Sequence, residues 1–275
     1  MLDKIVEKSP AKINLFLKII NKREDGFHNI RTGVTYINLF DEITVQPNKN
    51  FKVNYYGKFI PIRQNFNDCI IFKLFDFLQI KKPNLLISIN KNIPFQAGLG
   101  SASSNAATVI KILENLEVIE KKNIFEYSHL GSDIPLFLRE HDCLVRGRGD
   151  LLTNIIFPKY FFLLIKPNIN CSTKKMYHTF NKEDYIYNSD FDLEEINDFD
   201  NGNDFENKLF PLYPKLKKMF DYMQELEGSL FTRVTGSGSS IYSVFESKKE
   251  AELALIDFKK NYTNVWSVIT ENNFI

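Results

Sequence analysis

Residues 94–104 read Pro-Phe-Gln-Ala-Gly-Leu-Gly-Ser-Ala-Ser-Ser, a loop with two glycines and three hydroxyl side chains. The apolar residues 85–89 before it predict a strand, and residues 105–113 after it predict a helix, because their apolar side chains recur at i, i+3, i+4 and i+7. We expect Ser103 or Ser104 to cap that helix. Glycines allow backbone N–H groups to approach a ligand closely, and a helix N-terminus attracts an anion. The stretch therefore predicts a phosphate-binding turn between a strand and a helix.

This loop differs from the two most common phosphate motifs. It lacks the Gly-Lys-Ser/Thr ending of a P-loop and the third glycine of a dinucleotide fingerprint. A lone Gly-Leu-Gly-Ser segment is equally compatible with an ordinary strand-to-helix turn that needs glycine and a cap. The rest of the chain has to distinguish these two interpretations.

The composition is that of a globular protein large enough for one large domain or two ordinary ones. The 275 residues are 44% hydrophobic and 25% charged, and the formal net charge is +1. This charge gives no electrostatic case for binding nucleic acid or a membrane surface. The three cysteines are widely spaced, and no signal peptide is recognisable. We therefore expect a cytoplasmic protein whose cysteines are buried small hydrophobes.

The N-terminal residues 9–19 alternate in polarity with the period of a strand. Lys12 and Asn14 therefore lie on one face, opposite Ile13 and Leu15. A cation and an amide on one face suit a polar ligand, but they also suit a solvated sheet surface. The pattern by itself leaves both interpretations open.

A polar turn over residues 22–26 precedes Phe27 and His28. An aromatic ring beside a histidine can stack on a planar base and form hydrogen bonds with it, although an exposed loop without a function is an equally good interpretation. Residues 29–45 predict two strand pieces, with Asp41 and Glu42 marking a turn or edge between them.

A second cluster, residues 129–138, places Asp133 two residues before a proline and an apolar run. This position predicts a helix N-cap. A carboxylate there can also act as a catalytic base, and an ion pair with Lys12 would keep it ionised at neutral pH. The structural and the catalytic role are compatible.

Near residue 155 the sequence pattern changes, with Phe157-Pro158-Lys159 followed by an apolar strand. This change predicts domains at 1–155 and 156–275. The second half predicts an α+β unit. Residues 183–206 are strongly acidic, and we expect most of them to form a mobile solvated surface.

A third glycine cluster lies at residues 232–240. The other predicted elements are a helix at 69–78, a strand at 160–165, a helix beginning after Ser172, a proline-interrupted helix at 209–226, a strand at 241–245, a helix at 248–260 and a strand at 265–269.

Three clusters in this order and spacing resemble the three motifs of the GHMP kinases, which are small-molecule kinases without a P-loop. They are Pro-Ala-Lys-Ile-Asn-Leu at 10–15, Gly-Leu-Gly-Ser-Ala-Ser-Ser at 98–104 and Thr-Gly-Ser-Gly-Ser-Ser at 235–240. Arg-Glu-Asp-Gly-Phe-His at 23–28 and Asn-Asp-Phe-Glu at 203–206 make the chain most similar to the 4-diphosphocytidyl-2-C-methyl-D-erythritol kinases among them. The family usually has glycines where this chain has Ser101 and Ala102.

The resemblance implies a two-domain fold, with an N-terminal domain like domain 2 of ribosomal protein S5 and a ferredoxin-like C-terminal domain. It implies phosphorylation of the 2-hydroxyl of 4-diphosphocytidyl-2-C-methyl-D-erythritol in the non-mevalonate isoprenoid pathway, with ATP and Mg²⁺ as cofactors. The implied partner is a small molecule with a cytidine diphosphate moiety. No nucleic acid, membrane or obligate protein partner is implied.

The resemblance also implies roles for individual residues. The ATP-binding positions are Pro94, Phe95, Gln96, Ala97, Gly98, Leu99, Gly100, Ser101, Ala102, Ser103, Ser104 and Asn105. The catalytic positions are Asp133, which takes the hydroxyl proton, and Lys12, which holds Asp133 and the reacting oxygen. The substrate-binding positions are Asn14, Phe27, His28, Tyr177, Gly236 and Ser237, with Phe27, His28 and Tyr177 at the cytosine. No side chain is assigned as a metal ligand.

Two alternatives stay open at this point. Another GHMP kinase, acting on homoserine, mevalonate or a sugar, would share the three motifs but would have no use for the Asp-Gly-Phe-His arm at 25–28. A non-catalytic nucleotide- or RNA-binding module would share the S5-like first half. The presence of both Lys12 and Asp133 and the near-zero net charge disfavour that second alternative.

Overall fold

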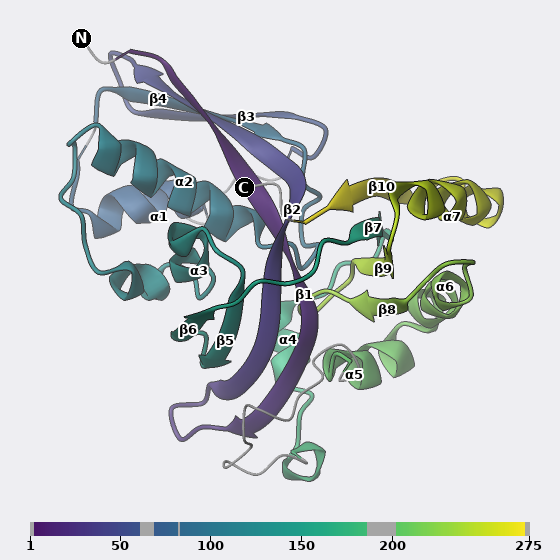
Figure 1. Ribbon diagram of the computed structural model, residues 1–275. Coiled ribbons are helices and arrows are strands. Elements are labelled where there is room, and N and C mark those ends of the chain that lie inside the picture. Colours follow the sequence, from purple (N-terminus) through teal and green to yellow (C-terminus); the bar gives the residue numbers. More distant parts are fainter. Residues whose placement is uncertain (1–2, 61–68, 82, 186–201, 273–275) are drawn as a thin grey trace. The chain divides into compact units, whose positions relative to one another are not determined.

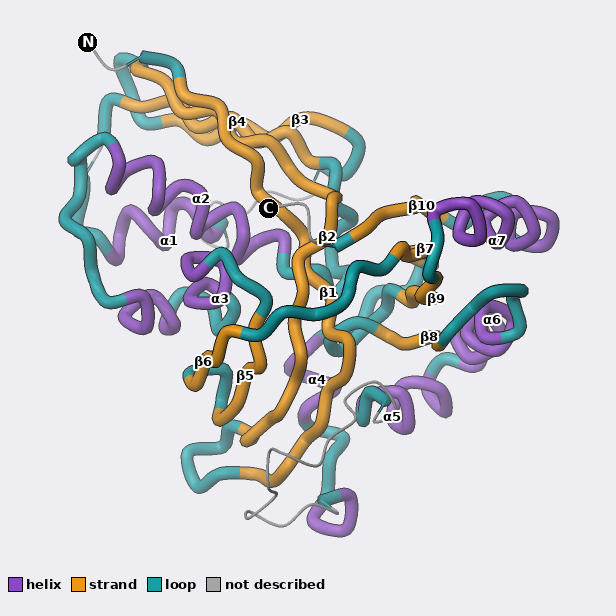
Figure 2. Tube along the Cα trace, in the orientation of Figure 1, coloured by secondary structure: helices purple, strands orange, loops and turns teal. Residues whose placement is uncertain are grey.

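The computed structural model describes residues 3–60, 69–81, 83–185 and 202–272 (Figures 1 and 2). The strands are β1 (Ile5–Lys22), β2 (His28–Pro47), β3 (Lys52–Gly57), β4 (Leu85–Lys91), β5 (Cys143–Gly147), β6 (Leu151–Asn154), β7 (Phe161–Lys166), β8 (Phe231–Val234), β9 (Ile241–Phe245) and β10 (Trp266–Glu271). The helices are α1 (Ile70–Phe77), α2 (Ser101–Asn115), α3 (Ile134–Arg139), α4 (Thr173–Tyr177), α5 (Phe205–Leu212), α6 (Pro214–Gln224) and α7 (Lys248–Asn261), with short 3-10 helices η2 (Ile124–His129) and η3 (Lys182–Asp184).

The chain forms two compact units, and each is assembled from several segments. Unit 1 comprises Met1–Ala11, Leu39–Phe95 and Gly100–His141. Unit 2 comprises Lys12–Asn38, Gln96–Leu99 and Asp142–Ile275. The long strands β1 and β2 contribute residues to both units. The predicted division of the chain into domains after residue 155 stays a prediction.

Unit 1 is built on β4, which pairs antiparallel with the end of β2 and parallel with β3. Alternate residues of β4 are buried, as expected of a strand with one face on a core. The connection from β3 to the parallel β4 contains α1, which buries Ile71, Leu74 and Phe75 and packs on α2. Helix α3 packs on α2 in turn.

Unit 2 contains a four-stranded antiparallel sheet in the order β10-β7-β9-β8. Helices α6 and α7 pack on this sheet. Every residue of β9 is buried because both of its faces are covered. On one face Ser243 Oγ donates to the carbonyl of Met223 in α6, and on the other Tyr242 Oη donates to the carbonyl of Asn14 in β1.

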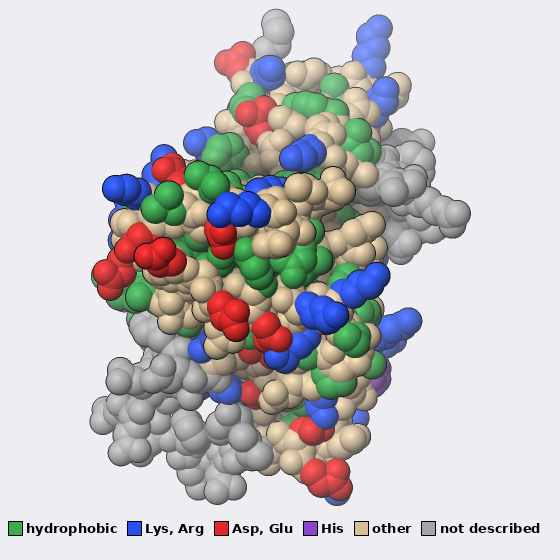
Figure 3. All heavy atoms as spheres, turned by 90° about the vertical axis from the view of Figure 1, so that its right-hand side faces the viewer, with side chains coloured by type: hydrophobic (Ala, Val, Ile, Leu, Met, Phe, Trp, Pro, Cys, Tyr) green, Lys and Arg blue, Asp and Glu red, His purple; other side chains and the backbone are tan. Residues whose placement is uncertain are grey.

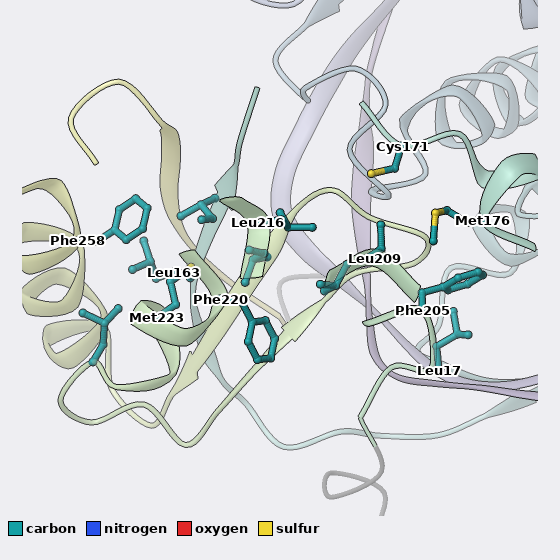
Figure 4. Close-up of a cluster of buried hydrophobic side chains, with 14 of the residues drawn as sticks. Leu17, Leu163, Cys171, Met176, Phe205, Leu209, Leu216, Phe220, Met223 and Phe258 are labelled. Atoms are coloured by element: carbon teal, nitrogen blue, oxygen red, sulfur yellow. The ribbon is translucent and has the colours of Figure 1, made fainter. Parts of the chain in front are cut away.

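Helices α5, α6 and α7 contribute many of the side chains in a cluster of buried hydrophobic residues of unit 2 (Figure 4). Phe205 and Leu209 of α5, Leu216, Phe220 and Met223 of α6 and Phe258 of α7 are all buried. Two sheets combined with packed helices confirm the predicted α+β class. In the rest of unit 2, β5 pairs antiparallel with the start of β2 and with β6.

Most predicted elements are confirmed to within a few residues. Of the two prolines predicted to interrupt the helix at 209–226, Pro214 does so, whereas Pro211 lies inside α5. Tyr213 ends α5, and its φ of −132° is not helical because Pro214 follows it. Ser172 caps α4 as predicted, with its Oγ accepting a hydrogen bond from Lys175 N at 3.4 Å. Cys143 and Cys171 are buried and Cys69 is half-buried, all three as free thiols.

The prediction for residues 29–45 is wrong. Residues 28–47 form one continuous strand, β2, and Asp41 is fully buried within it instead of marking a turn. The reason is that hydrogen-bond donors surround its carboxylate. The prediction of a mobile solvated surface for most of residues 183–206 stays a prediction, because residues 186–201 lie outside the described residues; at the end of this stretch Asn203 and Phe205 are buried.

Acidic and basic side chains are interspersed on the face drawn in Figure 3. This mixture agrees with the net charge of +1. None of the helices in the described part of the chain combines the length and the apolar character needed to cross a membrane.

We expect Phe258→Ala to lower the free energy of unfolding by about 3–5 kcal/mol, because it removes a fully buried ring and leaves a cavity. The matched control is Ile256→Ala on the same helix, where the side chain is 61% exposed and the expected loss is below about 0.5 kcal/mol. Equilibrium urea unfolding measures both. Equal losses would contradict the packing of α7 on the sheet.

Candidate active site

The candidate residues fall in both units. Unit 1 holds Asp133 and most of the predicted phosphate-binding positions, and unit 2 holds Lys12 and the predicted substrate-binding positions. The loop at residues 94–105 contributes to both, since residues 96–99 belong to unit 2 and its other residues to unit 1.

In unit 1, helix α2 begins at Ser101, earlier than predicted. Its N-cap is Gly100, with a positive φ of 72°, and no side chain caps the helix within the described residues. The predicted cap at Ser103 or Ser104 is therefore wrong. Glycine adopts this left-handed conformation without strain, so the chain turns directly into the helix. The first turn contains no acidic residue, and its N–H groups suit an anion.

Ser104 and Asn105 are held by Ser9 of β1. Ser9 Oγ lies 2.8 Å from both Ser104 Oγ and Asn105 Oδ1, and all three residues are buried. One hydroxyl proton serves only one acceptor, so a consistent assignment has Ser9 donate to Asn105 and accept from Ser104. These bonds fix the first turn of α2 to β1 inside unit 1.

Asp41 holds the same turn from the other side, a role that the sequence analysis missed. One carboxylate oxygen accepts hydrogen bonds from the backbone N–H groups of Asn92 and Ile93, at 2.8 and 2.9 Å. The other accepts from Ser101 Oγ at 2.8 Å and from Lys91 Nζ. Burial lowers the pKa of Lys91, and the Asp41 carboxylate opposes that shift. The serine that replaces a family glycine thus ties the helix start to β2.

Asp133 is at the predicted N-cap position of α3, but its side chain makes no capping hydrogen bond to that helix. It is half-buried. The loop in front of it approaches the first turn of α2, because a Cβ added to Gly131 would lie 3.0 Å from Ser103 Oγ. Unit 1 therefore brings the candidate base and the phosphate-binding turn together.

In unit 2, Lys12 and Asn14 lie on one face of β1, as predicted, and both are buried. Because the Lys12 and Asn14 side chains are buried, this face of β1 is not a solvated sheet surface. Lys12 Nζ donates to Asn14 Oδ1 at 2.7 Å, and Asn14 Nδ2 donates to Thr32 Oγ1 at 2.8 Å. These two bonds fix the orientation of the amide and hold the ammonium group in place. The backbone N–H of Lys12 also donates to Leu99 O at 3.1 Å.

Residues 96–99 of the loop and the third glycine cluster, residues 232–240, approach each other through their backbones. Gly98 has a φ of +74°, and a Cβ there would lie 2.3 Å from the carbonyl oxygen of Thr235. A Cβ on Gly236, with a φ of +55°, would lie 3.5 Å from Asn14 Oδ1 and 3.6 Å from Lys12 Nζ. Unit 2 thus assembles Lys12, Asn14 and Gly236 at one place, and the close approach requires glycine.

The residue after Gly236 connects this place to helix α4. Ser237 Oγ lies 2.8 Å from Thr173 Oγ1, and Ser239 Oγ donates to the carbonyl of Ile169. Helix α4 ends at Tyr177. The third glycine cluster is therefore tied to the helix that carries a predicted substrate residue.

His28 is buried in a cluster of aromatic rings in unit 2. Its ring stacks on Tyr177, with centroids 5.0 Å apart at 27°, and its Nε2 lies 3.1 Å from Tyr185 Oη. Phe180 lies edge-on to it at 6.4 Å. Burial, together with the positive charge of Lys22, lowers the pKa of His28 and favours the neutral imidazole. The sequence pattern gave no signal for Phe180 or Tyr185.

Phe27 differs from His28 in being exposed. Its ring is 58% accessible, with the Arg148 guanidinium 5.8 Å from its centroid. Phe27 lies in the turn before β2, whereas His28 is the first residue of that strand, which explains the contrast. An exposed ring next to a buried imidazole offers both a stacking surface and hydrogen-bonding nitrogens.

We expect Gly98→Ala to lower the free energy of unfolding more than Gly228→Ala. Both glycines have a positive φ, which costs an L-residue roughly 1–2 kcal/mol. At Gly228 the added Cβ meets only ordinary contacts from 3.4 Å, whereas at Gly98 it meets the Thr235 carbonyl and adds roughly 1–3 kcal/mol of overpacking. Urea unfolding of both variants measures the difference, and equal losses would contradict the close approach.

Comparison with known proteins agrees with this arrangement. The family model for the GHMP kinase N-terminal domain matches residues 69–138, and the model for the GHMP kinase C-terminal domain matches residues 185–264. The 4-diphosphocytidyl-2-C-methyl-D-erythritol kinase of Francisella tularensis subsp. tularensis is 35% identical over 255 residues, covering 89% of this chain and 88% of that protein. The protein of the same name from Pelagibacter ubique is 33% identical over 275 residues, covering 95% and 96%.

Solved structures give the same family. A crystal structure of 4-(cytidine 5'-diphospho)-2C-methyl-D-erythritol kinase superposes with a TM-score of 0.79 at 26% identity, covering 98% of this chain and all of that one. A mevalonate kinase structure superposes with a TM-score of 0.64 at 16% identity, over 98% of both chains, which shows the shared fold alone. With identity above 30% over nearly the whole length of its relatives, this chain belongs to the 4-diphosphocytidyl-2-C-methyl-D-erythritol kinase family of the GHMP kinases.

Proposed function

We propose that the protein transfers the γ-phosphoryl group of ATP to the 2-hydroxyl of 4-diphosphocytidyl-2-C-methyl-D-erythritol, giving the 2-phosphate and ADP in the non-mevalonate isoprenoid pathway. The observation that carries this proposal is the 33–35% identity over about nine-tenths of the chain to relatives named for that kinase. The geometry within each unit supports it, because unit 1 offers an anion-binding helix start and unit 2 offers a site for a planar base.

The ATP phosphates occupy the turn at residues 94–105. The uncapped first turn of α2 supplies backbone N–H donors and the positive end of the helix dipole. Ser101 and Ser104 are fixed by Asp41 and Ser9, so the donors are preorganised and need little rearrangement when ATP binds. Phosphoryl transfer depends mainly on such positioning and on neutralising charge.

Asp133 is the general base. The 2-hydroxyl oxygen forms a bond to the γ-phosphorus, the bond from that phosphorus to the β,γ-bridging oxygen breaks, and Asp133 takes the hydroxyl proton. Lys12 stabilises the charge that develops on the reacting oxygen, with its ammonium held by Asn14. Lys12 belongs to unit 2 and Asp133 to unit 1.

The residues present fit Mg²⁺ bound mainly through the nucleotide. Within the described residues, no group of three or more His, Cys, Asp or Glu side chains could hold a metal by itself. Mg²⁺ in kinases is usually held by one or two protein oxygens, waters and phosphates. The Ser103 hydroxyl, which faces the loop of Asp133, supplies such an oxygen. The ion would neutralise phosphate charge.

The cytidine moiety binds in unit 2. Phe27 offers an exposed ring for stacking, and the neutral His28 imidazole offers hydrogen bonds to the base edge. Tyr177 stacks on His28 and completes the aromatic wall. The diphosphate-bearing end of the substrate lies near Asn14, Gly236 and Ser237.

A coupled ADP-release assay tests the proposal. It contains ATP, Mg²⁺ and 4-diphosphocytidyl-2-C-methyl-D-erythritol, with homoserine and mevalonate in parallel reactions. Turnover with the cytidyl substrate alone is the expected result. Turnover with another alcohol would contradict the proposed cytosine site but not the fold or the role of Asp133. ATP binding without any turnover would indicate a non-catalytic module.

We expect Asp133→Asn to lower kcat by about 10²–10⁴-fold, because the amide cannot take the hydroxyl proton. ATP binding should persist, as measured by isothermal titration calorimetry. The control is Asp76→Asn, which changes an exposed carboxylate on α1 of the same unit and should leave kcat unchanged. Wild-type turnover of Asp133→Asn would rule out its role as the base.

We expect KM for the cytidyl substrate to be constant above neutral pH and to rise as the pH falls below about 6.5, the ordinary histidine value. The sign follows from the lowered pKa of His28, since the imidazole stays neutral at pH 7 and gains a proton only in more acidic solution. His28→Ala should raise KM about tenfold or more and abolish this pH dependence, whereas His141→Ala, at an exposed histidine, should change neither. An unchanged KM profile in His28→Ala would exclude the histidine from the site.

A further inference from the structure

The residues Asn-Asp-Phe-Glu at 203–206 lead into helix α5 and have no role in the reaction described above. Each of their four side chains contacts a different part of unit 2. Asn203 and Phe205 are buried and Asp204 and Glu206 are half-buried. Four consecutive side chains that all hold other segments of unit 2 call for a common explanation.

Asn203 holds the third glycine cluster. Its Nδ2 donates to the carbonyl of Val234 at 2.7 Å and to the carbonyl of Gly236 at 2.8 Å, and its Oδ1 accepts from Phe205 N at 3.0 Å. Both amide protons and the amide oxygen are therefore used, and the amide has one orientation. The carbonyl of Gly236 belongs to the peptide that links Gly236 to Ser237, so Asn203 fixes the plane of that peptide.

Asp204 and Glu206 fix the segment between two strands. The Asp204 carboxylate accepts from Lys18 Nζ at 2.9 Å and from Ile19 N at 2.8 Å, both in β1. Glu206 Oε1 accepts from Val234 N at 2.8 Å, at the end of β8. Backbone bonds from Leu17 N to Gly202 O and from Asp204 N to Leu17 O add to the attachment at β1.

Phe205 packs behind the aromatic cluster. Its ring lies edge-on to Tyr177, with centroids 5.0 Å apart, and edge-on to Phe180, at 5.4 Å. Tyr177 in turn stacks on His28. The orientation of Tyr177 thus depends on a ring that is itself 1% exposed and immobilised in the core.

We propose that residues 203–206 position the cytidyl substrate indirectly. Asn203 fixes the orientation of the Gly236–Ser237 peptide, and Phe205 fixes the orientation of the Tyr177 ring. This inference rests on the proposed function, in which Gly236, Ser237 and Tyr177 contact that substrate. Asn203 is a positioning residue, because it acts through the loop and not on the substrate. Its hydrogen bonds go to Val234, Gly236 and Phe205, none of which is an ATP-binding position, so its loss affects the cytidyl substrate more than ATP.

The test compares Asn203→Ala with Asn272→Ala, a matched change in the same unit. Asn272 is also fully buried, and its amide also binds backbone groups, accepting from Tyr160 N at 2.8 Å and donating to Pro158 O at 2.9 Å. Both variants lose a buried amide, so thermal unfolding should show similar losses of stability. Only Asn203→Ala should raise KM for the cytidyl substrate, by about tenfold or more, with a smaller change in KM for ATP.

Two further measurements separate positioning from general damage. Cytidine 5'-diphosphate binding, measured by calorimetry, should weaken in Asn203→Ala and not in Asn272→Ala, and this readout does not depend on turnover. In a double-mutant cycle, Asn203→Ala and Ser237→Ala should be less than additive in KM, because both act through the same loop. If Asn203→Ala does not fold, Asn203→Ser carries the same comparisons, since its hydroxyl can still donate to one of the two carbonyls.

The outcomes are distinguishable. An active wild type whose Asn203 variants keep wild-type KM and cytidine 5'-diphosphate affinity would overturn this inference and leave the proposed function intact. A rise in KM for ATP equal to that for the cytidyl substrate would also overturn it, by showing general damage. A wild type that neither binds cytidine 5'-diphosphate nor turns over the cytidyl substrate would overturn the proposed function and this inference together.

Discussion

The contact of Gly98 with the Thr235 carbonyl is the constraint on which the candidate site in unit 2 depends. The space between these two backbone segments cannot hold a single Cβ atom. This approach brings residues 96–99 and the third glycine cluster together. Gly236 thereby lies beside the side chains of Lys12 and Asn14. Glycine contributes here through its small size and its freedom to adopt a positive φ, and neither property produces a hydrophobic pattern in the sequence.

A few buried polar side chains position further parts of the two units through hydrogen bonds. Asn14, Asn203 and Asp41 are each nearly inaccessible, and each binds two or more groups from distant parts of the sequence. A buried polar group left unpaired is costly, so such a residue tolerates only the arrangement in which its partners are present. These side chains therefore specify the local geometry more narrowly than apolar packing does.

In the proposed reaction the two units carry different parts of the chemistry. Unit 1 contains the proposed phosphate-binding helix start and Asp133, and Ser9 and Asp41 fix that helix start. Unit 2 contains Lys12, the aromatic cluster around His28 and the third glycine cluster. Each unit preorganises its own groups through contacts inside its own core, which limits the rearrangement needed when a ligand binds.

The sequence by itself determined the α+β class, the alternation that puts Lys12 and Asn14 on one face of β1, and the family. Residue order suffices for these because strand and helix periods are local properties and because the family motifs are short and linear. It failed at Asp41, which was predicted in a turn, at Ser103 and Ser104, which were predicted as caps, and at the burial of Asn203. Only the tertiary structure decided these, because the partners of a buried polar side chain lie tens of residues away along the chain. The same holds for Phe180 and Tyr185, since only folding brings them to His28.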